Sequence, residues 1–261
     1  MSLDQPIEFV KHQTVTRDAF LGGRLTLSQP RNGFRAGLDS VLLGAAVPKG
    51  TARLADLGAG VGTAGLVALA LGLAETALLA EIDAEALTLA AENIAANGFA
   101  ARAEAHAIDI AAPAAARRAA GLVDNGFDAV IANPPFFAAG RGTPAPDASR
   151  AGARHMPEAD LDQWVRSAAA SAKAGGTVIF VYPATALAPL LASFSARFGA
   201  ITLLPLCPRP GEAASRVLIR GIKGSRAPLT LLASRVLHGT DGRAFSAEFD
   251  AIFRGAARLD W

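Results

Sequence analysis

The sequence predicts an α/β fold in which a mostly parallel sheet carries helices on both faces. From Arg53 onward, short apolar runs typical of buried strands alternate with longer segments that have a helical pattern. Strands that alternate with helices form right-handed βαβ units, and such units build a parallel sheet. The chain has 261 residues, which is enough for one large domain of this kind.

The pattern places the elements in a definite order along the chain. Apolar runs predict strands at 53–57, 77–82, 103–108, 127–132, 177–182, 201–206, 215–222 and 229–237, with the last two as an antiparallel pair. Helical patterns cover 63–73, 85–97, 161–174 and 184–198, and the Ala-rich stretch 111–120 is expected to form or approach another helix. Gly98 and Gly175-Gly176 are expected to end the second and third of these helices.

The first 50 residues differ from this pattern, and we expect them to form a small cap packed on a core domain of residues 51–261. Gly22-Gly23 and Gln29-Pro30 are turn signals, which indicate a short hairpin. The apolar run from Asp39 to Val47 is expected to be a helix that leads into the core. A further segment, 138–157, is long for a connection inside a domain and is expected to be a functional loop.

Composition points to a reducing compartment. Cys207 is the single cysteine, so no disulfide within the chain is possible, and no Cys/His cluster has the spacing of metal ligands. Residues 1–13 are polar and lack the apolar core of a secretory signal. Residues 57–74 are uncharged, but five glycines interrupt them, so a strand, a turn and a buried helix explain them better than a membrane span. We therefore expect a cytoplasmic protein with no bound metal and no membrane contact.

The charge distribution favours a polyanionic partner. The net charge is +2, yet residues 51–130 hold 4 Lys/Arg against 10 Asp/Glu, whereas the remainder holds 21 against 13. A basic periphery around an acidic centre suits a nucleic acid outside and a small-molecule site inside, although chance partition explains the asymmetry equally well. Basic residues of the later strands and turns are candidates for RNA contact, with ordinary strand-edge charge as a nearly equal alternative: Arg209, Arg216, Arg220, Lys223 and Arg226.

The first chemical motif is Asp56-Leu57-Gly58-Ala59-Gly60-Val61-Gly62, which follows a strand and opens a helix. Glycines let the backbone turn sharply and approach a ligand closely. The dinucleotide fingerprint would need a third Gly at Thr63, which is absent. Asp56, just before the glycines, could reach the amino-acid part of S-adenosylmethionine, directly or through water. Both details favour S-adenosylmethionine over a dinucleotide.

Two further acidic positions follow the next two strands. A carboxylate at Glu81 can accept both hydroxyls of a ribose, and Asp83 is expected to be the N-cap of the following helix. Asp109 comes after the third strand, where its side chain could meet the amine of an adenine. The simpler alternatives are that Glu81 and Asp83 only cap a helix and that Asp109 only forms a turn.

The third motif is Asn133-Pro134-Pro135-Phe136, after the strand 127–132. Two prolines stop the strand and supply no N–H, so carbonyl oxygens face the crevice where open α/β sheets bind ligands. The Asn133 side-chain oxygen and the Pro134 carbonyl could accept both N–H groups of a planar amine, while Phe136 stacks on its ring. This arrangement predicts methyl transfer to such an amine by alignment alone, without a metal or a covalent intermediate.

In this order and spacing, the three motifs resemble those of class I methyltransferases that modify exocyclic amines through an (N/D)PP(Y/F) sequence. The N-terminal residues extend the resemblance. Residues 16–25, Gln29-Pro30 and residues 33–43 look like those of the bacterial tRNA(Val) adenine-N6 methyltransferases, which act on the adenine just 3′ of the anticodon. The likeness covers nearly the whole chain and is looser after Pro157.

The resemblance implies a Rossmann-like class I methyltransferase fold with a seven-stranded, mostly parallel sheet and an antiparallel last strand. It also implies S-adenosylmethionine as donor and a tRNA as substrate. The sequence does not determine the oligomeric state, and a monomer is slightly favoured. Carried over by position, the catalytic residues are Asn133, Pro134, Pro135 and Phe136. The implied donor-binding residues are Asp56, Gly58, Gly60, Glu81, Asp109 and Asn133, with Arg35, Ala36 and Asp39 closing from the cap.

Several alternatives remain open at this point. Within the class, an rRNA guanine-N2 enzyme can share the NPPF sequence, and a protein glutamine methyltransferase usually carries Tyr in place of Phe136. Outside the class stand a dinucleotide-dependent oxidoreductase and a methyltransferase-like fold retained only for RNA binding. The intact Asp56, Gly58, Gly60, Glu81 and Asn133 argue against such loss of activity.

Overall fold

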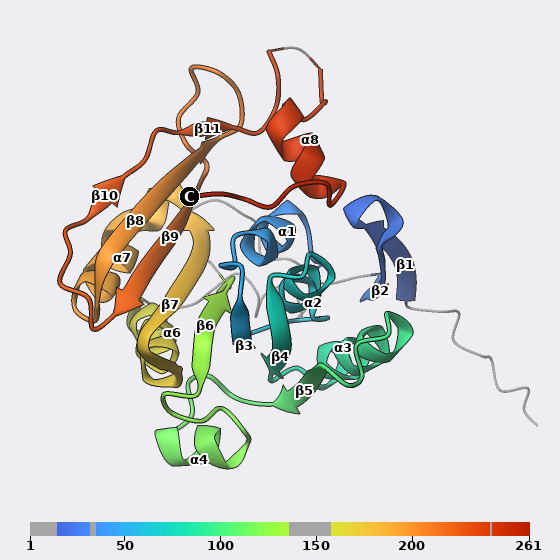
Figure 1. Ribbon diagram of the computed structural model, residues 1–261, viewed down its shortest axis with the longest axis vertical. Helices are drawn as coiled ribbons and strands as arrows, with labels where there is room; N and C mark the ends of the chain where they lie inside the picture. The colour runs from blue at the N-terminus through green and yellow to red at the C-terminus, as the bar shows by residue number, and fades with distance from the viewer. Residues whose placement is uncertain (1–14, 32–34, 136–157, 241) are drawn as a thin grey trace, which may run out of the picture.

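A computed structural model describes residues 15–31, 35–135, 158–240 and 242–261, and its centre is a single large sheet (Figure 1). The strands run in the order β10-β8-β9-β7-β6-β3-β4-β5, and β11 also pairs with β8. Seven of them are long: β3 (Thr51–Leu57), β4 (Ala74–Glu81), β5 (Ala103–Ala107), β6 (Phe127–Ala132), β7 (Ala172–Pro183), β8 (Phe198–Cys207) and β9 (Arg216–Lys223). The seven-stranded sheet is therefore confirmed, with two short strands added at one edge.

The sheet is parallel except at β9, which runs antiparallel to both β7 and β8. The expected antiparallel pair of 215–222 with 229–237 is wrong. Because β9 is already paired on both sides, it has no free edge for another partner. The later segment instead supplies β10 (Thr230–Leu231) and β11 (Arg235–Val236), which pair parallel with β8 at the outer edge.

Helices cover both faces of the sheet and bury two apolar layers. One layer contains α1 (Leu38–Ala45), α2 (Thr63–Ala70), α3 (Ala84–Ala96) and α8 (Ala247–Phe253). The other contains α6 (Glu158–Ser171) and α7 (Leu187–Ser195), and α4 (Ala114–Ala119) adjoins it through the next residue, Ala120. Within the described ranges, no helix has the length and apolar character needed to cross a membrane.

Two helix boundaries differ from the sequence prediction. Gly175-Gly176 does not end α6, since α6 stops at Ser171 and both glycines lie inside β7. The pairing of β6 with β7 shifts register beyond Phe127, and the positive φ of Gly175 (75°) accommodates the extra residues. The segment expected as one helix from residue 184 divides into a 3-10 turn (Ala184–Ala186) and α7, and Phe198 begins β8.

The N-terminal region forms the expected hairpin and helix. Strands β1 (Val15–Phe20) and β2 (Leu25–Pro30) are antiparallel and are joined by a 3-10 turn at Leu21–Gly23. Leu25 and Leu27 are fully buried in the same apolar layer as α1, α2 and α3. Whether residue 50 is a domain boundary stays a prediction.

Two asparagines of α3 bind the backbone of β2. The Asn93 amide oxygen accepts from the Ser28 N–H (2.7 Å), and its nitrogen donates to the carbonyls of Ser28 and Val61 (3.0 Å each). One turn later, Asn97 exchanges the same pair of hydrogen bonds with Thr26 (3.0 Å each). The backbone groups of alternate β2 residues thus form hydrogen bonds with asparagine side chains of α3, in place of those that a neighbouring strand would supply.

We expect Asn93→Ala to lower the free energy of unfolding by about 2–3 kcal/mol, because it leaves buried backbone groups of Ser28 and Val61 without partners. Urea unfolding followed by circular dichroism measures this change. Glu92→Ala is the matched control, because Glu92 is exposed on the same helix. Equal unfolding free energies for the two variants would contradict the role given to Asn93.

Candidate functional site

The registers of four parallel strands align the three sequence motifs at one edge of the sheet. Leu57 at the end of β3 pairs with Ala132 of β6 on one side and with Ala80 of β4 on the other. The next residues along these strands are therefore neighbours: Gly58 lies between Asn133 and Glu81. Glu81 in turn pairs with Ala107 of β5, two residues before Asp109. This is the carboxyl edge, where open α/β sheets bind ligands.

The chain also changes sides at this edge. Helix α2, which follows β3, packs on one face of the sheet, and α6, the helix that precedes β7, packs on the other. A crevice opens where two neighbouring strands send their connections to opposite faces. The ends of β3 and β6 are such a pair, so Gly58 and Asn133 border the crevice from its two sides.

The Gly-rich turn has the backbone shape that the sequence predicts. Gly58, Gly60 and Gly62 have φ values of 65°, 56° and 89°, a region that residues with a Cβ rarely adopt. A Cβ on Gly58 would stand 2.4 Å from the Trp164 ring of α6, so that position has no room for a side chain. A Cβ on Gly60 would meet nothing within 4 Å. Gly60 therefore faces open space in which a ligand can lie against the backbone.

The Glu81 carboxylate joins the end of β4 to this turn. One oxygen accepts from the Gly60 N–H (2.7 Å), and the other accepts from the N–H groups of Ile82 (2.8 Å) and Asp83 (2.9 Å). A carboxylate has about four acceptor positions, so the oxygen that faces Gly60 keeps capacity for a further donor. A hydroxyl group of a ligand over the turn is a suitable donor.

Asp56 is buried and anchors the start of α2. Its carboxylate accepts from the Gly65 N–H (2.8 Å), which the N-cap, Gly62, cannot satisfy because it has no side chain. Burial, opposed by the Gly65 hydrogen bond and reinforced by the negative charge of Glu81, raises the pKa of Asp56 to about 7. Asp56 therefore shapes the turn from behind, and its contact with the ligand's amino-acid part, directly or through water, stays a prediction.

The other two acidic candidates have local roles. Asp83 is the N-cap of α3 as expected, because its side chain accepts from the Ala86 N–H (2.8 Å). Asp109 is exposed and accepts from the Ala111 N–H (2.8 Å), as a turn aspartate does. One oxygen of Asp109 has this bond, so its position at the edge of the site is compatible with a second partner.

The strand β6 ends at Ala132, and the first three residues of the proline motif leave the sheet there. Asn133 is half-buried, Pro134 is buried and Pro135 is half-buried. Phe136 and the segment 138–157 lie outside the described residues. The described part of the motif thus places an amide side chain and two residues without N–H groups directly beside Gly58.

The cap residues are fixed by a polar network on the hairpin. Arg35 donates to Thr16 (2.8 Å), to the Pro30 carbonyl (3.0 Å) and to Asp18 (2.5 Å). The Ala36 N–H donates to the buried side chain of Gln29 (2.8 Å).

The same segment is tied to the sheet through Asp39. Its carboxylate forms an ion pair with Arg216 (2.8 Å), the first residue of β9, which pairs with Pro183 at the end of β7. The N-terminus of α1 therefore lies at the carboxyl edge of the sheet. This position suits the expected closure over the site from the cap.

The sequence did not reveal two residues that border the site. Trp164 lies against Gly58, and no local pattern connects a helix in the second half of the chain with a turn in the first. Ile82 follows Glu81 and is 65% exposed, although it is a large apolar residue at the end of a buried strand. An apolar side chain beside the Glu81 carboxylate could have been recognised as a surface for a flat ring.

The raised pKa of Asp56 predicts a pH dependence of stability. Between pH 4 and 7 the folded protein retains a proton that the unfolded chain releases, so Asp56 makes stability fall as pH rises. Asp56→Asn keeps an acceptor for Gly65. Its free energy of unfolding, relative to that of the wild type, should rise by up to about 1.4 kcal/mol per pH unit in this window. Urea unfolding at several pH values measures the difference. A difference that stays constant across these pH values would contradict the assignment.

Comparison with known proteins agrees with this geometry. The family model described as the methyltransferase small domain matches residues 36–146. The chain is 30% identical over 211 residues to tRNA1(Val) (adenine(37)-N6)-methyltransferase of Actinobacillus succinogenes, which covers 79% of this chain and 84% of the relative. It is 32% identical to the enzyme of the same name from Tolumonas auensis, over 60% of this chain and 62% of the relative.

A solved structure supports the same relationship. The crystal structure of a protein from Agrobacterium tumefaciens, described as a predicted O-methyltransferase, is 34% identical and has a TM-score of 0.70. The match covers 85% of this chain and 98% of that protein. With the relatives above, these findings show that the chain belongs to the tRNA1(Val) (adenine(37)-N6)-methyltransferase family, within the class I methyltransferase fold.

Proposed function

We propose that this protein transfers a methyl group from S-adenosylmethionine to the exocyclic N6 of an adenine in tRNA, the adenine just 3′ of the anticodon. The observation that carries the proposal is the alignment of Glu81, the Gly58–Gly62 turn and Asn133 at three adjacent strand ends. This alignment supports a nucleoside donor and a planar amine bound side by side. The names of the relatives supply the tRNA and the position of the base.

The residues at the turn fit the donor. Open space in front of Gly60 admits a ligand close to the backbone, and the remaining acceptor capacity of Glu81 suits ribose hydroxyls. The exposed Ile82 offers an apolar surface to the adenine, with Asp109 at the edge of the same region. The donor supplies an electrophilic methyl group on a sulfonium, and the protein's part is to hold and orient both reactants.

Asn133 and Pro134 would prepare the acceptor. The nitrogen of an adenine amine is a poor nucleophile because its lone pair is delocalised into the ring. Two acceptors, the Asn133 side-chain oxygen and the Pro134 carbonyl, take both N–H groups and favour the pyramidal nitrogen as charge develops. A hydroxyl group has one hydrogen to offer such a pair, so this turn suits an amine better than the oxygen named for the Agrobacterium protein.

The choice of adenine over guanine or glutamine rests on the family and not on the turn. Guanine and glutamine also present a planar amine to two acceptors, whereas the curated relatives act on adenine. A tRNA-modifying role also implies a cytoplasmic location for the protein. A dinucleotide-dependent reaction has no use for the Asn133 turn, and no relative named above supports it.

The decisive experiment identifies the product. Purified protein is given a labelled donor and bulk tRNA from cells that lack the gene, and the RNA is digested to nucleosides. We expect N6-methyladenosine. Labelled N2-methylguanosine, or labelling of rRNA or a release-factor-like protein without labelling of tRNA, would overturn the substrate assignment.

We expect Asn133→Ala to reduce kcat/KM by roughly 10²–10³, because one of the two acceptors for the amine is lost. Donor affinity, measured by calorimetry, should stay within about twofold, and Asn133→Asp should retain part of the activity because an acceptor oxygen remains. If Asn133→Ala kept full activity, the role of this side chain would be wrong.

Trp164 should report donor binding through its fluorescence. Its ring lies against Gly58, whereas Trp261 is bound to the Ala46 carbonyl (3.0 Å) at the end of α1. We expect S-adenosylhomocysteine to change the emission of the wild type and of Trp261→Phe, but not that of Trp164→Phe. A change that is lost in Trp261→Phe instead would show that Trp164 lies away from the donor.

A further inference from the structure

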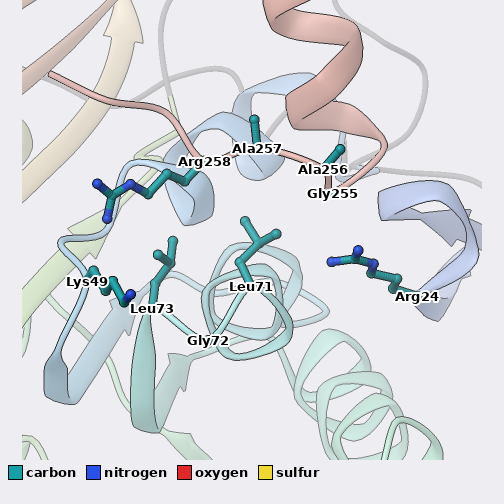
Figure 2. Close-up of a pocket in the computed structure, with 9 residues that line it drawn as sticks. All are labelled: Arg24, Lys49, Leu71, Gly72, Leu73, Gly255, Ala256, Ala257 and Arg258. Carbon is teal, nitrogen blue, oxygen red and sulfur yellow. The ribbon is translucent and has the colours of Figure 1, made fainter.

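A pocket at the opposite edge of the sheet collects three cationic side chains. It has a volume of about 330 Å³, and its walls come from the hairpin turn, the α1–β3 turn, the α2–β4 turn and the segment after α8. Figure 2 shows Arg24 approaching from one side, with Lys49 and Arg258 on the other and Leu71 and Leu73 between them. None of the described residues that line it is acidic.

The charges of this pocket are largely available to a ligand. Arg24, Lys49 and Arg258 are all exposed. Arg258 uses its Nε in an ion pair with Asp260 (2.8 Å), which leaves the two terminal nitrogens of the guanidinium for other acceptors. Leu71 and Leu73 form an apolar floor, and an apolar wall strengthens the field of nearby charges because it excludes water.

The pocket is held in place by the last residues of the chain. After α8, the Leu259 N–H donates to the Ala45 carbonyl (3.0 Å), and the Trp261 indole donates to the Ala46 carbonyl (3.0 Å). These bonds satisfy carbonyls at the end of α1, which would otherwise lack partners. They also fix Arg258, the residue before Leu259, beside the turn that carries Lys49.

Most of the basic residues that the sequence analysis named as candidates for RNA contact instead bind other residues of the protein. Arg209 donates to the Gly239 and Gly242 carbonyls, and Arg216 pairs with Asp39. Arg220 stacks on the Trp261 ring at 4.6 Å, and Lys223 binds Asn125 and the Ala172 carbonyl. Arg226, the fifth candidate, forms no such contact with the described residues. The charge of the other four serves folding, so the RNA needs cations from another surface.

We propose that the Arg24–Lys49–Arg258 pocket binds a backbone phosphate of the tRNA substrate, an inference that rests on the proposed function. Lys49 and Arg258 lie on one side of the opening and Arg24 on the other (Figure 2), so the pocket offers positive charge to a phosphate from two sides. Arg17 and Arg31, both exposed on or next to the hairpin, extend positive charge from this pocket toward the methyl-transfer edge. The cap therefore provides a path for the RNA backbone between the two ends of the sheet.

The location determines which part of the tRNA reaches the pocket. Leu73 precedes β4, and Glu81 ends it, so the pocket and the donor turn are separated by the length of that strand. Eight residues of strand span about 25 Å. This is more than one nucleotide can bridge, so the bound phosphate belongs to a part of the tRNA away from the methylated adenine. Binding there adds affinity without changing the chemistry at Asn133.

A structural role for the same cations is the rival reading. The pocket lies at the ends of α2 and α8, and positive charge near a helix C-terminus stabilises the helix. In that case, removing the charges would lower stability and leave tRNA affinity unchanged. The two readings therefore differ in what the same variant does.

The experiment compares the triple variant Arg24→Gln/Lys49→Gln/Arg258→Gln with the full-length wild type. Filter binding of tRNA over a range of salt concentrations gives the affinity and its salt dependence. We expect the affinity to fall ~10-fold or more at low salt, and the slope of log K against log salt to decrease by about 1, as for the loss of one phosphate contact. Methyl transfer at saturating tRNA, donor affinity and the melting temperature should be close to the wild-type values.

The control is Arg118→Gln/Arg166→Gln/Arg243→Gln, which removes the same charge from exposed sites on α4, α6 and the segment before α8. An equal loss of tRNA affinity in both triple variants would show that only the net charge of the protein matters. That result would contradict phosphate binding by the pocket. Unchanged affinity with a lower melting temperature would establish the structural reading instead.

Two further outcomes separate the remaining possibilities. If inorganic phosphate at constant ionic strength stabilises the wild type but not the triple variant, while tRNA affinity is equal, the pocket serves a small free phosphate and the RNA assignment fails. If the wild type neither binds nor methylates tRNA, the proposed function itself fails. If the wild type methylates tRNA and the triple variant binds tRNA with unaltered affinity, only the inference about the pocket fails.

Discussion

The Gly-rich turn after β3 is held by three side chains, and the geometry of the site depends on this restraint. Glu81 accepts from Gly60, Asn93 donates to the Val61 carbonyl, and Asp56 accepts from Gly65. A turn built from glycines has many accessible conformations, so its ordering costs more conformational entropy than that of other residues. The three anchors come from β4, α3 and β3, and each is itself fixed by the sheet or by a helix packed on it. The turn is therefore shaped before any ligand arrives.

These anchors connect the Gly-rich turn to the N-terminal hairpin and to a pair of nearby carboxyl groups. Asn93 holds Val61 and β2 with the same amide, so a displacement of the hairpin would be felt at the turn. Asp56 and Glu81 put two carboxyl groups behind one short loop, and their proximity contributes to the raised pKa of Asp56. A positively charged ligand above the turn would oppose that effect and favour the ionised form of Asp56. Donor binding and proton release are then linked through a side chain that need not touch the donor.

The sequence predicted what depends on local pattern and chain order. Strands β3 to β7, the hairpin, α1 and the turn glycines follow from apolar periodicity and from glycine or proline signals. The prediction failed where contacts between residues distant in the sequence determine the secondary structure or the strand pairing. Gly175-Gly176 has the composition of a helix stop, yet a register shift against β6 places both glycines in a strand. The run after Leu229 is apolar, but β9 has no free edge to pair with it.

The same limit applies to the site. Glu81 and Asn133 could be placed because each follows a strand, and parallel strands end at one edge. The contacts of Asp56 and Trp164 could not be predicted from the sequence, since both depend on which helix packs beside the turn. Arg209, Arg216, Arg220 and Lys223 looked like RNA ligands because composition does not distinguish a free cation from one that is bound by carbonyls, a carboxylate or a ring.

The position of the cap explains how one small hairpin can serve both ends of the sheet. Strand β2 begins beside the basic pocket, where Arg24 precedes it, and ends at Pro30, whose carbonyl binds Arg35 near the carboxyl edge. Asn93 and Asn97 fix this strand to α3 along its length, so the hairpin behaves as part of the rigid core. A long polyanion lying on such a surface would be held at a fixed distance from Asn133. Recognition of the RNA and alignment of its amine would then reside in different residues of a single domain. The substrate could be selected without any change in the turn that we propose performs the chemistry.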